Sequence, residues 1–397
     1  MNLNLNPPFE IRPADIMAQL PTQFFATLVG NVSRLTAQGH DVINLGQGNP
    51  DQPTPAHIVA RLKEAADNPQ YHKYSPFSGY SFLKEAIAKR YKEDYQVDLD
   101  PETEVAILFG GKTGLVELPQ ILLNPGELCL VPDPGYPDYW SGVALARAEM
   151  KFMPLVESND YLPDYSAISD RDKERARLMF LNYPNNPTSA DAPLSFYEET
   201  VAFAAQHGIV VASDFAYGAI GFDGHRPVSF LQAEGAKDVG IEFYTLSKTY
   251  NMAGWRVGFA LGNARIISLI NQLQDHMYVS LFGGIQSAAA EALTGPQDCV
   301  RDLVSVYQSR RDAFHDALKG IGWNAAKPTG SFFSWLPVPK GFTSVSFANL
   351  LLEEAHVVMA PGVGFGAHGE GYVRAGLLSS EERLQEAAAR IGKLGVF

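Results

Sequence analysis

The chain has 397 residues, of which 46% are hydrophobic and 19% are charged, so it is long enough to bury one large core and a second, smaller one. Its formal net charge of −13 argues against a broad nucleic-acid-binding surface, because such a surface needs basic side chains that replace counterions. No apolar run approaches the roughly 20 residues of a membrane span, so we expect a soluble protein without nucleic-acid or membrane partners.

The amino terminus, MNLNLNPPFEIRP, lacks the basic and apolar regions of a secretory signal. The two cysteines, Cys129 and Cys299, lie far apart and show no CxxC or Cys/His spacing. We therefore expect a cytoplasmic protein with two reduced thiols and no metal site.

Short apolar runs alternate with helical patterns between about residues 105 and 262, whereas the first 45 residues show no such alternation and are expected to pack against a carboxyl-terminal domain. The runs are bounded by Gly, Pro, Asn or Asp, as in a sheet that is covered on both faces. They are EVAILFGG (104–111), ELCLVPD (127–133), RLMFLNYP (177–184), GIVVASD (208–214), IEFYTLS (241–247) and RVGFALG (256–262). This alternation predicts a mostly parallel α/β sheet.

Residues 193–208 are typical of the helices between these runs. Ser195 and Glu198 have the spacing of a capping box, and Gly208 supplies a stop signal. The run GGKTG (110–114) opens another helix, which Pro119 is expected to limit or kink.

The pattern changes after about residue 295. A long helical stretch is followed by strand-like runs at 331–338 and 372–378 and by a final helix at 379–394, where Ser379 and Glu382 have capping-box spacing. We expect an amino-terminal segment (1–48) that joins the small domain, a large domain (49–294) and a small α+β domain (295–397).

Polar residues follow the carboxyl ends of the predicted strands, where ligands bind in α/β proteins. They are the turn GGKTG (110–114), Asn186, Asp214, Tyr217, Lys248 and Arg256. Each alone has an ordinary interpretation, since a glycine turn can be a tight connection, an aspartate can cap a helix and a lysine can reach solvent. Together they provide the amine, carboxylate, hydrogen-bond donors and cation that pyridoxal 5′-phosphate requires.

With these residues in place, the sequence resembles the class I/II pyridoxal-phosphate aminotransferases of the aspartate aminotransferase superfamily (fold type I), over nearly its whole length. The motifs that carry the resemblance are GQGNPD (46–51), KYSPFSG (73–79), PDPGYPDY (132–139), YPNNPT (183–188), DFAY (214–217), TLSKTYNMAGWRVG (245–258) and YVRAGL (372–377). Two positions depart from the usual pattern: Ser189 replaces a glycine, and Lys112 replaces a Ser or Thr and adds a possible cation. The resemblance implies a large domain with a seven-stranded sheet flanked by helices and a small α+β domain built from both termini.

The resemblance also implies a role for each matching residue. Lys248 would react with the cofactor's aldehyde and later act as a general base, and Asp214 would keep the pyridine nitrogen protonated. Asn186 and Tyr217 would bind the phenolic oxygen, and Tyr136 would stack on the ring. The residues expected at the phosphate are Gly111, Lys112, Thr245, Ser247, Arg256 and Tyr74, with Tyr74 reaching the site of a second subunit in a homodimer.

For the amino acid and 2-oxo acid substrates, Arg374 would hold the α-carboxylate by a two-pronged ion pair, assisted by Gly48 and Asn186. The region 275–284 offers only His276 as a cation for a second carboxylate, which favours an apolar side chain. Candidate walls are Phe24, Phe25, Tyr278 and Phe282, although each of these aromatic residues could equally belong to the core.

Longer runs resemble the methionine-salvage aminotransferases of bacilli, which implies transamination of 4-methylthio-2-oxobutyrate to methionine. Aromatic, branched-chain or other amino acids, including LL-diaminopimelate, remain open as substrates. A pyridoxal-phosphate-dependent carbon–sulfur β-lyase is an alternative reaction on the same scaffold. A cofactor-sensing regulator is disfavoured, because the chain has no room for a separate DNA-binding domain.

Overall fold

The computed structural model describes residues 10–21 and 24–397, and within helix α1 it describes the side chains only from residue 29 onward. None of the helices in these ranges is both long and apolar enough to cross a membrane. The thiols of Cys129 and Cys299 are free, the first buried and the second half-buried.

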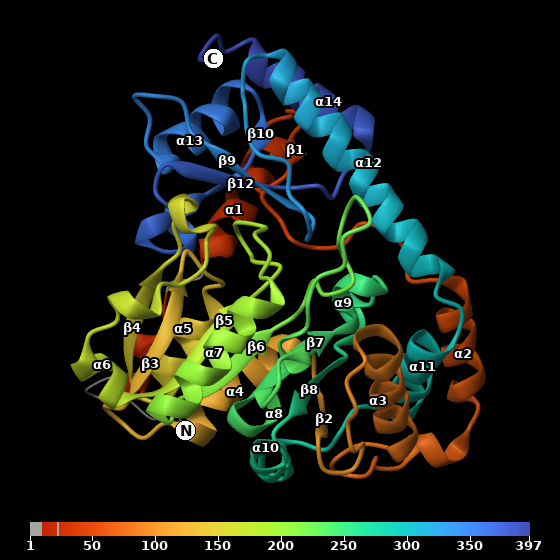
Figure 1. Cartoon of the computed structure of the whole chain (residues 1–397). Helices are drawn as coiled ribbons and strands as arrows, with labels where there is room; N and C mark the ends of the chain where they lie inside the picture. Colours follow the sequence, from red (N-terminus) through yellow and green to blue (C-terminus); the bar gives the residue numbers. More distant parts are fainter. Residues whose placement is uncertain (1–9, 22–23) are drawn as a thin grey trace, which may run out of the picture.

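A seven-stranded sheet forms the centre of the larger part of the molecule (Figure 1). Its order is β2 (Val105–Leu108), β8 (Gly258–Gly262), β7 (Gly240–Thr245), β6 (Val210–Asp214), β5 (Ala176–Asn182), β3 (Leu128–Asp133) and β4 (Glu149–Pro154). Only β8 runs antiparallel to its neighbours, so the predicted mostly parallel sheet is confirmed. Strand β4 was missed as an apolar run because it is an edge strand with mainly exposed side chains.

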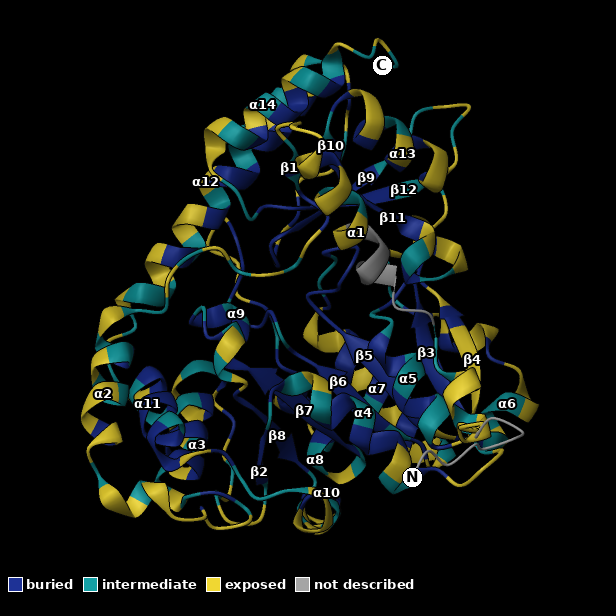
Figure 2. Ribbon diagram, turned by 180° about the vertical axis from the view of Figure 1, so that it is seen from behind, coloured by how far each residue is buried: buried dark blue, intermediate teal, exposed yellow. Residues whose placement is uncertain are grey.

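Helices cover both faces of this sheet, and Figure 2 shows its inner strands as buried and the edge strand β4 as mainly exposed. Alternate residues of β5 enter two separate cores: Leu178 and Phe180 face one core, and Met179 and Leu181 face the other. The flanking helices are α3 (Ser81–Tyr95), α4 (Gly111–Leu122), α5 (Asp138–Leu145), α6 (Asp170–Arg175), α7 (Leu194–His207), α8 (Ala236–Val239), α9 (Leu246–Thr249), α10 (Ala264–Met277) and α11 (Gly283–Thr294).

The two ends of the chain meet in the smaller part of the molecule. There β1 (Ile43–Asn44) pairs in parallel with β10 (Val357–Val358), and β11 (Ala360–Pro361), β12 (Tyr372–Gly376) and β9 (Phe333–Pro337) form an antiparallel sheet. The helices of this part are α1 (Phe24–Ala37), α12 (Asp298–Gly320), α13 (Ser344–Glu354) and α14 (Glu381–Gly392), whereas α2 (Ala56–Ala66) packs against α11 in the larger part (Figure 1). The small α+β unit built from both termini is thus confirmed, whereas the boundaries at 48/49 and 294/295 stay predictions.

Three local expectations about helix ends differ from the structure. Helix α7 starts at Leu194 with Pro193 as its N-cap, so Ser195 lies inside the helix and forms no capping box; Gly208 ends it in the left-handed conformation, as predicted. Helix α14 is capped by Ser380 instead of Ser379. Pro119 lies within α4, near its end, and does not stop it.

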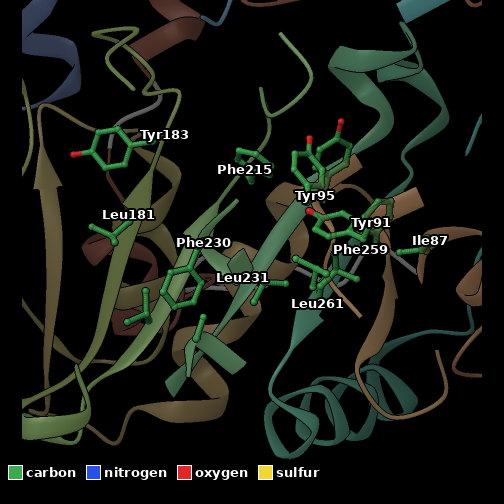
Figure 3. Close-up of a cluster of buried hydrophobic side chains, with 14 of the residues drawn as sticks. Ile87, Tyr91, Tyr95, Leu181, Tyr183, Phe215, Phe230, Leu231, Phe259 and Leu261 are labelled. Carbon is green, nitrogen blue, oxygen red and sulfur yellow. The ribbon is translucent and has the colours of Figure 1, made fainter. Parts of the chain in front are cut away.

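A buried carboxyl group anchors the middle of the sheet. Glu242 on β7 is fully buried and accepts hydrogen bonds from the hydroxyls of Tyr91 (3.0 Å), Ser229 (2.6 Å) and Ser213 (3.2 Å) and from the Phe230 backbone N–H (2.8 Å). Figure 3 shows Tyr91 among the aromatic side chains that fill this core. Because these donors are shielded from water, they depend on Glu242 for their acceptor.

We expect Glu242→Ala to lower the free energy of unfolding by about 2–4 kcal/mol, since it leaves several buried donors without a partner. Glu242→Gln keeps one acceptor oxygen and should lose less. Urea unfolding followed by circular dichroism measures both variants, and a loss below about 0.5 kcal/mol for the alanine variant would contradict this role.

Candidate active site

A cavity of about 500 Å³ opens at the carboxyl ends of the sheet strands. Most of the predicted site residues line it, although they come from distant parts of the chain. They are Gly48, Gly111, Lys112, Tyr136, Asn186, Asp214, Tyr217, Thr245, Ser247, Lys248, Arg256 and Arg374.

One end of the cavity is built to hold an anion. Helix α4 begins at Gly111, after Gly110 in a positive-φ conformation (82°). A Cβ on Gly110 would lie 2.3 Å from Nη2 of Arg256, so only glycine lets the guanidinium come this close. Thr245 and Ser247, whose hydroxyls are 2.9 Å apart, lie on the same cavity wall. Backbone N–H groups at a helix start together with a guanidinium favour a phosphate.

Lys112 also reaches this region, but its ammonium group is engaged. Its Nζ lies 2.9 Å from Oδ1 of Asp138, and half of the side chain is exposed. The additional cation expected from the sequence is therefore partly neutralised.

Lys248 lies deep in the cavity on the short helix α9. Its Nζ donates a hydrogen bond to the Gly48 carbonyl (2.7 Å) and lies 5.4 Å from the centre of the Phe332 ring. Burial, assisted by the positive charges of Arg374 and Arg256, lowers the pKa of Lys248 to about 8. The neutral, nucleophilic form of the amine is therefore populated close to neutral pH.

Asp214 ends β6 and accepts a hydrogen bond from the Tyr139 hydroxyl (2.7 Å). Burial raises the pKa of Asp214 to about 6, opposed by this bond and by the positive charge of Lys248. Tyr139 was not assigned a role from the sequence, although it lies three residues after Tyr136 in the PDPGYPDY run. Its fully buried ring stacks on Phe180 at 4.7 Å, which fixes the hydroxyl beside the carboxylate.

Arg374 on β12 is only 1% exposed. Its Nη1 donates to Oδ1 of Asn186 and its Nη2 to the Gly46 carbonyl, both at 2.8 Å. The guanidinium lies 4.0 Å from the Phe333 ring centre and 4.7 Å from that of Phe365. Burial lowers the pKa of Arg374 to about 10, so it stays charged at pH 7.

Two phenols complete the wall. Burial raises the pKa of both Tyr136 and Tyr217 above the ordinary value, so their hydroxyl groups remain neutral donors. Tyr217 packs edge-on against Phe332 (5.3 Å) and Phe333 (5.8 Å). The sequence did not point to these phenylalanines because nothing local separates them from other core residues.

The structure places two predicted residues, Tyr74 and Tyr278, outside the lining of this cavity. Tyr74 is 92% exposed, and the side chain of Phe25 lies outside the described residues. Tyr278 donates its hydroxyl to Glu117 (2.6 Å) and packs edge-on against Phe109 (4.7 Å), and it is absent from the cavity lining.

The donor set fits an anionic, aldehyde-bearing aromatic cofactor of the kind that the sequence resemblance implies. A helix start with Arg256 suits its phosphate, Lys248 suits an aldehyde, and Asp214 suits a ring nitrogen. The guanidinium of Arg374, which lines the same cavity, suits a carboxylate.

Comparisons with known proteins agree with this geometry. The family model described as "Aminotransferase class I and II" matches residues 40–391. The chain is 64% identical to the L-glutamine--4-(methylsulfanyl)-2-oxobutanoate aminotransferase of Bacillus subtilis over 96% of each chain. It is 46% identical to the LL-diaminopimelate aminotransferase of Syntrophobacter fumaroxidans, covering 96% of this chain and 98% of that one. A substrate-bound structure of BacF from Bacillus subtilis superposes with a TM-score of 0.94 at 51% identity over 98% of both chains.

We expect Gly110→Ala to abolish anion binding at the start of α4, because the added methyl group must displace Arg256. Inorganic phosphate should raise the melting temperature of the cofactor-free wild type by roughly a few degrees and leave that of the variant unchanged. The control is Gly126→Ala, since Gly126 also has a φ of 82° but nothing within 4 Å of an added Cβ. A phosphate effect that survives in Gly110→Ala would contradict this assignment.

Proposed function

The chain belongs to the class I and II aminotransferases, and we propose that it uses pyridoxal 5′-phosphate to transfer an amino group to 4-methylthio-2-oxobutyrate, forming methionine. The observation that carries this proposal is the convergence of Lys248, Asp214 and Arg374 on one cavity beside an anion-binding helix start. The 64% identical relative, whose name contains the same 2-oxo acid, supports the substrate.

We assign the binding of the cofactor to residues of this cavity. Gly111, Thr245, Ser247 and Arg256 would hold the phosphate, and Asp214 would face the ring nitrogen. When bound, the cofactor supplies an electron sink that stabilises negative charge at the substrate Cα. Asn186 accepts from Arg374 through Oδ1, so its Nδ2 is left to donate to a ligand oxygen, as Tyr217 can with its hydroxyl.

Lys248 is the proposed base. An amine with a pKa of about 8 accepts a proton from the substrate Cα near neutral pH and gives it up again readily. Burial keeps water away from this exchange, while the Gly48 carbonyl and the Phe332 ring hold Nζ in place.

The cavity favours a substrate with one carboxylate. Among the described residues that line it, the cations are Lys112, Lys248, Arg256 and Arg374. Lys112 pairs with Asp138, and the other three are assigned to the cofactor and the α-carboxylate, so none is left for a distal carboxylate. The LL-diaminopimelate aminotransferase that is 46% identical to this chain makes LL-diaminopimelate the substrate to compare.

We further propose a homodimer in which Tyr74 reaches the cofactor phosphate of the other subunit. Tyr74 itself is 92% exposed. Two further large apolar side chains are exposed, Phe77 nearby in sequence (57%) and Phe282 at the start of α11 (39%), and exposed side chains of this kind support an interface. We also assign the enzyme to the cytoplasm, where reduced thiols such as Cys129 and Cys299 persist.

The proposal is tested by adding glutamine and other amino acids, together with a series of 2-oxo acids, to the cofactor-loaded enzyme and measuring the amino acids formed. We expect 4-methylthio-2-oxobutyrate to give the highest kcat/KM, and Lys248→Ala to be inactive. Preference for LL-diaminopimelate would shift the substrate assignment, and pyruvate released from cystathionine without a new amino acid would indicate the lyase instead.

Arg374→Lys should raise the KM for every amino and oxo acid by roughly a hundredfold, because lysine cannot form the two-pronged bond to a carboxylate. Steady-state kinetics on an amino donor and a 2-oxo acceptor measure the effect. An unchanged KM for both would remove Arg374 from the carboxylate site.

Covalent uptake of pyridoxal 5′-phosphate by the cofactor-free enzyme should accelerate as the pH rises through about 8, because only the neutral Lys248 amine attacks an aldehyde. Arg374→Gln removes a positive charge that disfavours the ammonium form, so the midpoint should move to higher pH. Absorbance-detected mixing experiments give both midpoints, and a midpoint that stays or falls in the variant would contradict this electrostatic coupling.

A further inference from the structure

An irregular segment between Leu45 and Thr54 passes from the small sheet to the cavity. Its first end is fixed by backbone bonds from Leu45 N to the Val358 carbonyl (2.8 Å) and from Gly376 N to the Leu45 carbonyl (2.7 Å). At its other end, the Thr54 hydroxyl donates to the Asn251 carbonyl (2.7 Å). Between these anchors the segment contains neither helix nor strand.

This segment supplies the carbonyl acceptors of two cations in the site. Gly46 accepts from Nη2 of Arg374 at 2.8 Å, and Gly48 accepts from Nζ of Lys248 at 2.7 Å. A shift of the segment would therefore move or release both groups at once. Its position sets the orientation of the guanidinium that is assigned to the substrate carboxylate.

An ion pair between the buried Arg310 and the partly exposed Asp51 holds the segment between its anchors. Arg310 donates through Nη1 and Nη2 to the two carboxylate oxygens of Asp51, at 2.9 and 2.7 Å. The Arg310 side chain is only 7% exposed and that of Asp51 is 26% exposed. Gln52 also donates to Asp51 (2.7 Å), but it lies on the same segment and cannot fix it to another element.

Arg310 connects this segment to two rigid elements. It belongs to α12, the long helix that runs along one side of the molecule from α2 and α11 to α14 (Figure 1). Its Nη1 also donates to the carbonyl of Leu377 (3.2 Å), directly after β12, which carries Arg374. The Arg310 guanidinium thus fixes the distance between the Leu45–Thr54 segment and β12, the strand that carries Arg374.

We infer that Asp51 and Arg310 are positioning residues, whose ion pair holds the carbonyls of Gly46 and Gly48 against Arg374 and Lys248 and so determines the affinity for the substrate carboxylate. Neither side chain lines the cavity, so both act through the backbone of the segment. The inference rests on the proposed function in one respect, namely that Arg374 binds the substrate.

A neighbouring ion pair provides the matched control. Arg311, the next residue of α12, is also buried and makes the same two-pronged contact with Asp223 (2.6 and 2.9 Å). Asp223 follows Phe222 in a loop that gives no acceptor to Arg374 or Lys248. Breaking this second pair removes a similar interaction from the same helix without touching the Leu45–Thr54 segment.

The test compares Asp51→Asn, Arg310→Lys and Asp223→Asn as cofactor-loaded enzymes. Asparagine is nearly isosteric with aspartate, and lysine keeps the charge of Arg310 but cannot form both bonds. We expect the first two variants to raise the KM for amino and oxo acids by roughly five- to tenfold with kcat changed less than about twofold. Affinity for 4-methylthiobutanoate, an inert acid measured by calorimetry, should fall by the same factor, whereas Asp223→Asn should match the wild type in both measurements.

The double variant Asp51→Asn/Arg310→Lys should have a KM no higher than that of the worse single variant, since the two side chains act as one pair. Additive effects would overturn the inference, as would wild-type KM and affinity in Asp51→Asn or equal losses in Asp223→Asn. A wild-type enzyme that does not transaminate would instead contradict the proposed function, so the two failures are distinguishable.

Discussion

The burial of the Arg374 guanidinium is the constraint on which the site depends. A charged group that is 1% exposed is tolerated only where its donors have partners, because an unpaired buried charge is strongly destabilising. The partners here are Asn186 from the segment after β5 and Gly46 from the amino-terminal segment, and the guanidinium also lies over the rings of Phe333 and Phe365. Four distant parts of the sequence must therefore assemble around one side chain.

The same burial sets the protonation chemistry. Burial of Lys248, assisted by the nearby charges of Arg374 and Arg256, lowers the pKa of the lysine to about 8, while burial of Asp214 raises its pKa to about 6. The two environments bring the base and the carboxylate towards neutral pH from opposite sides. Hydrogen bonds from the Tyr139 hydroxyl to Asp214 and from Lys248 to the Gly48 carbonyl hold these two groups in place.

Sequence patterns were sufficient for six of the seven strands of the large sheet and for the residues at the strand ends. The apolar runs bounded by turn residues predicted the sheet, and the strand ends placed Asp214, Lys248 and the GGKTG turn together, because parallel strands end at the same edge. Contacts between distant residues were not accessible in this way. Tyr139 reaches Asp214 across 75 positions, and Arg310 reaches Asp51 across 259, with no local periodicity to mark either pair. The start of α14 was also misplaced by one residue, because the adjacent Ser379 and Ser380 offer equivalent caps until packing selects one.

The most direct measurement is calorimetry of the cofactor-loaded wild-type enzyme with 4-methylthiobutanoate and with its primary amide. The two ligands share the thioether chain but differ in the charge that Arg374 is assigned to recognise. The account predicts that the acid binds at least about tenfold more tightly than the amide, as a charge-assisted bond to a buried guanidinium requires. Equal affinities would contradict it, since the carboxylate would then be bound without Arg374.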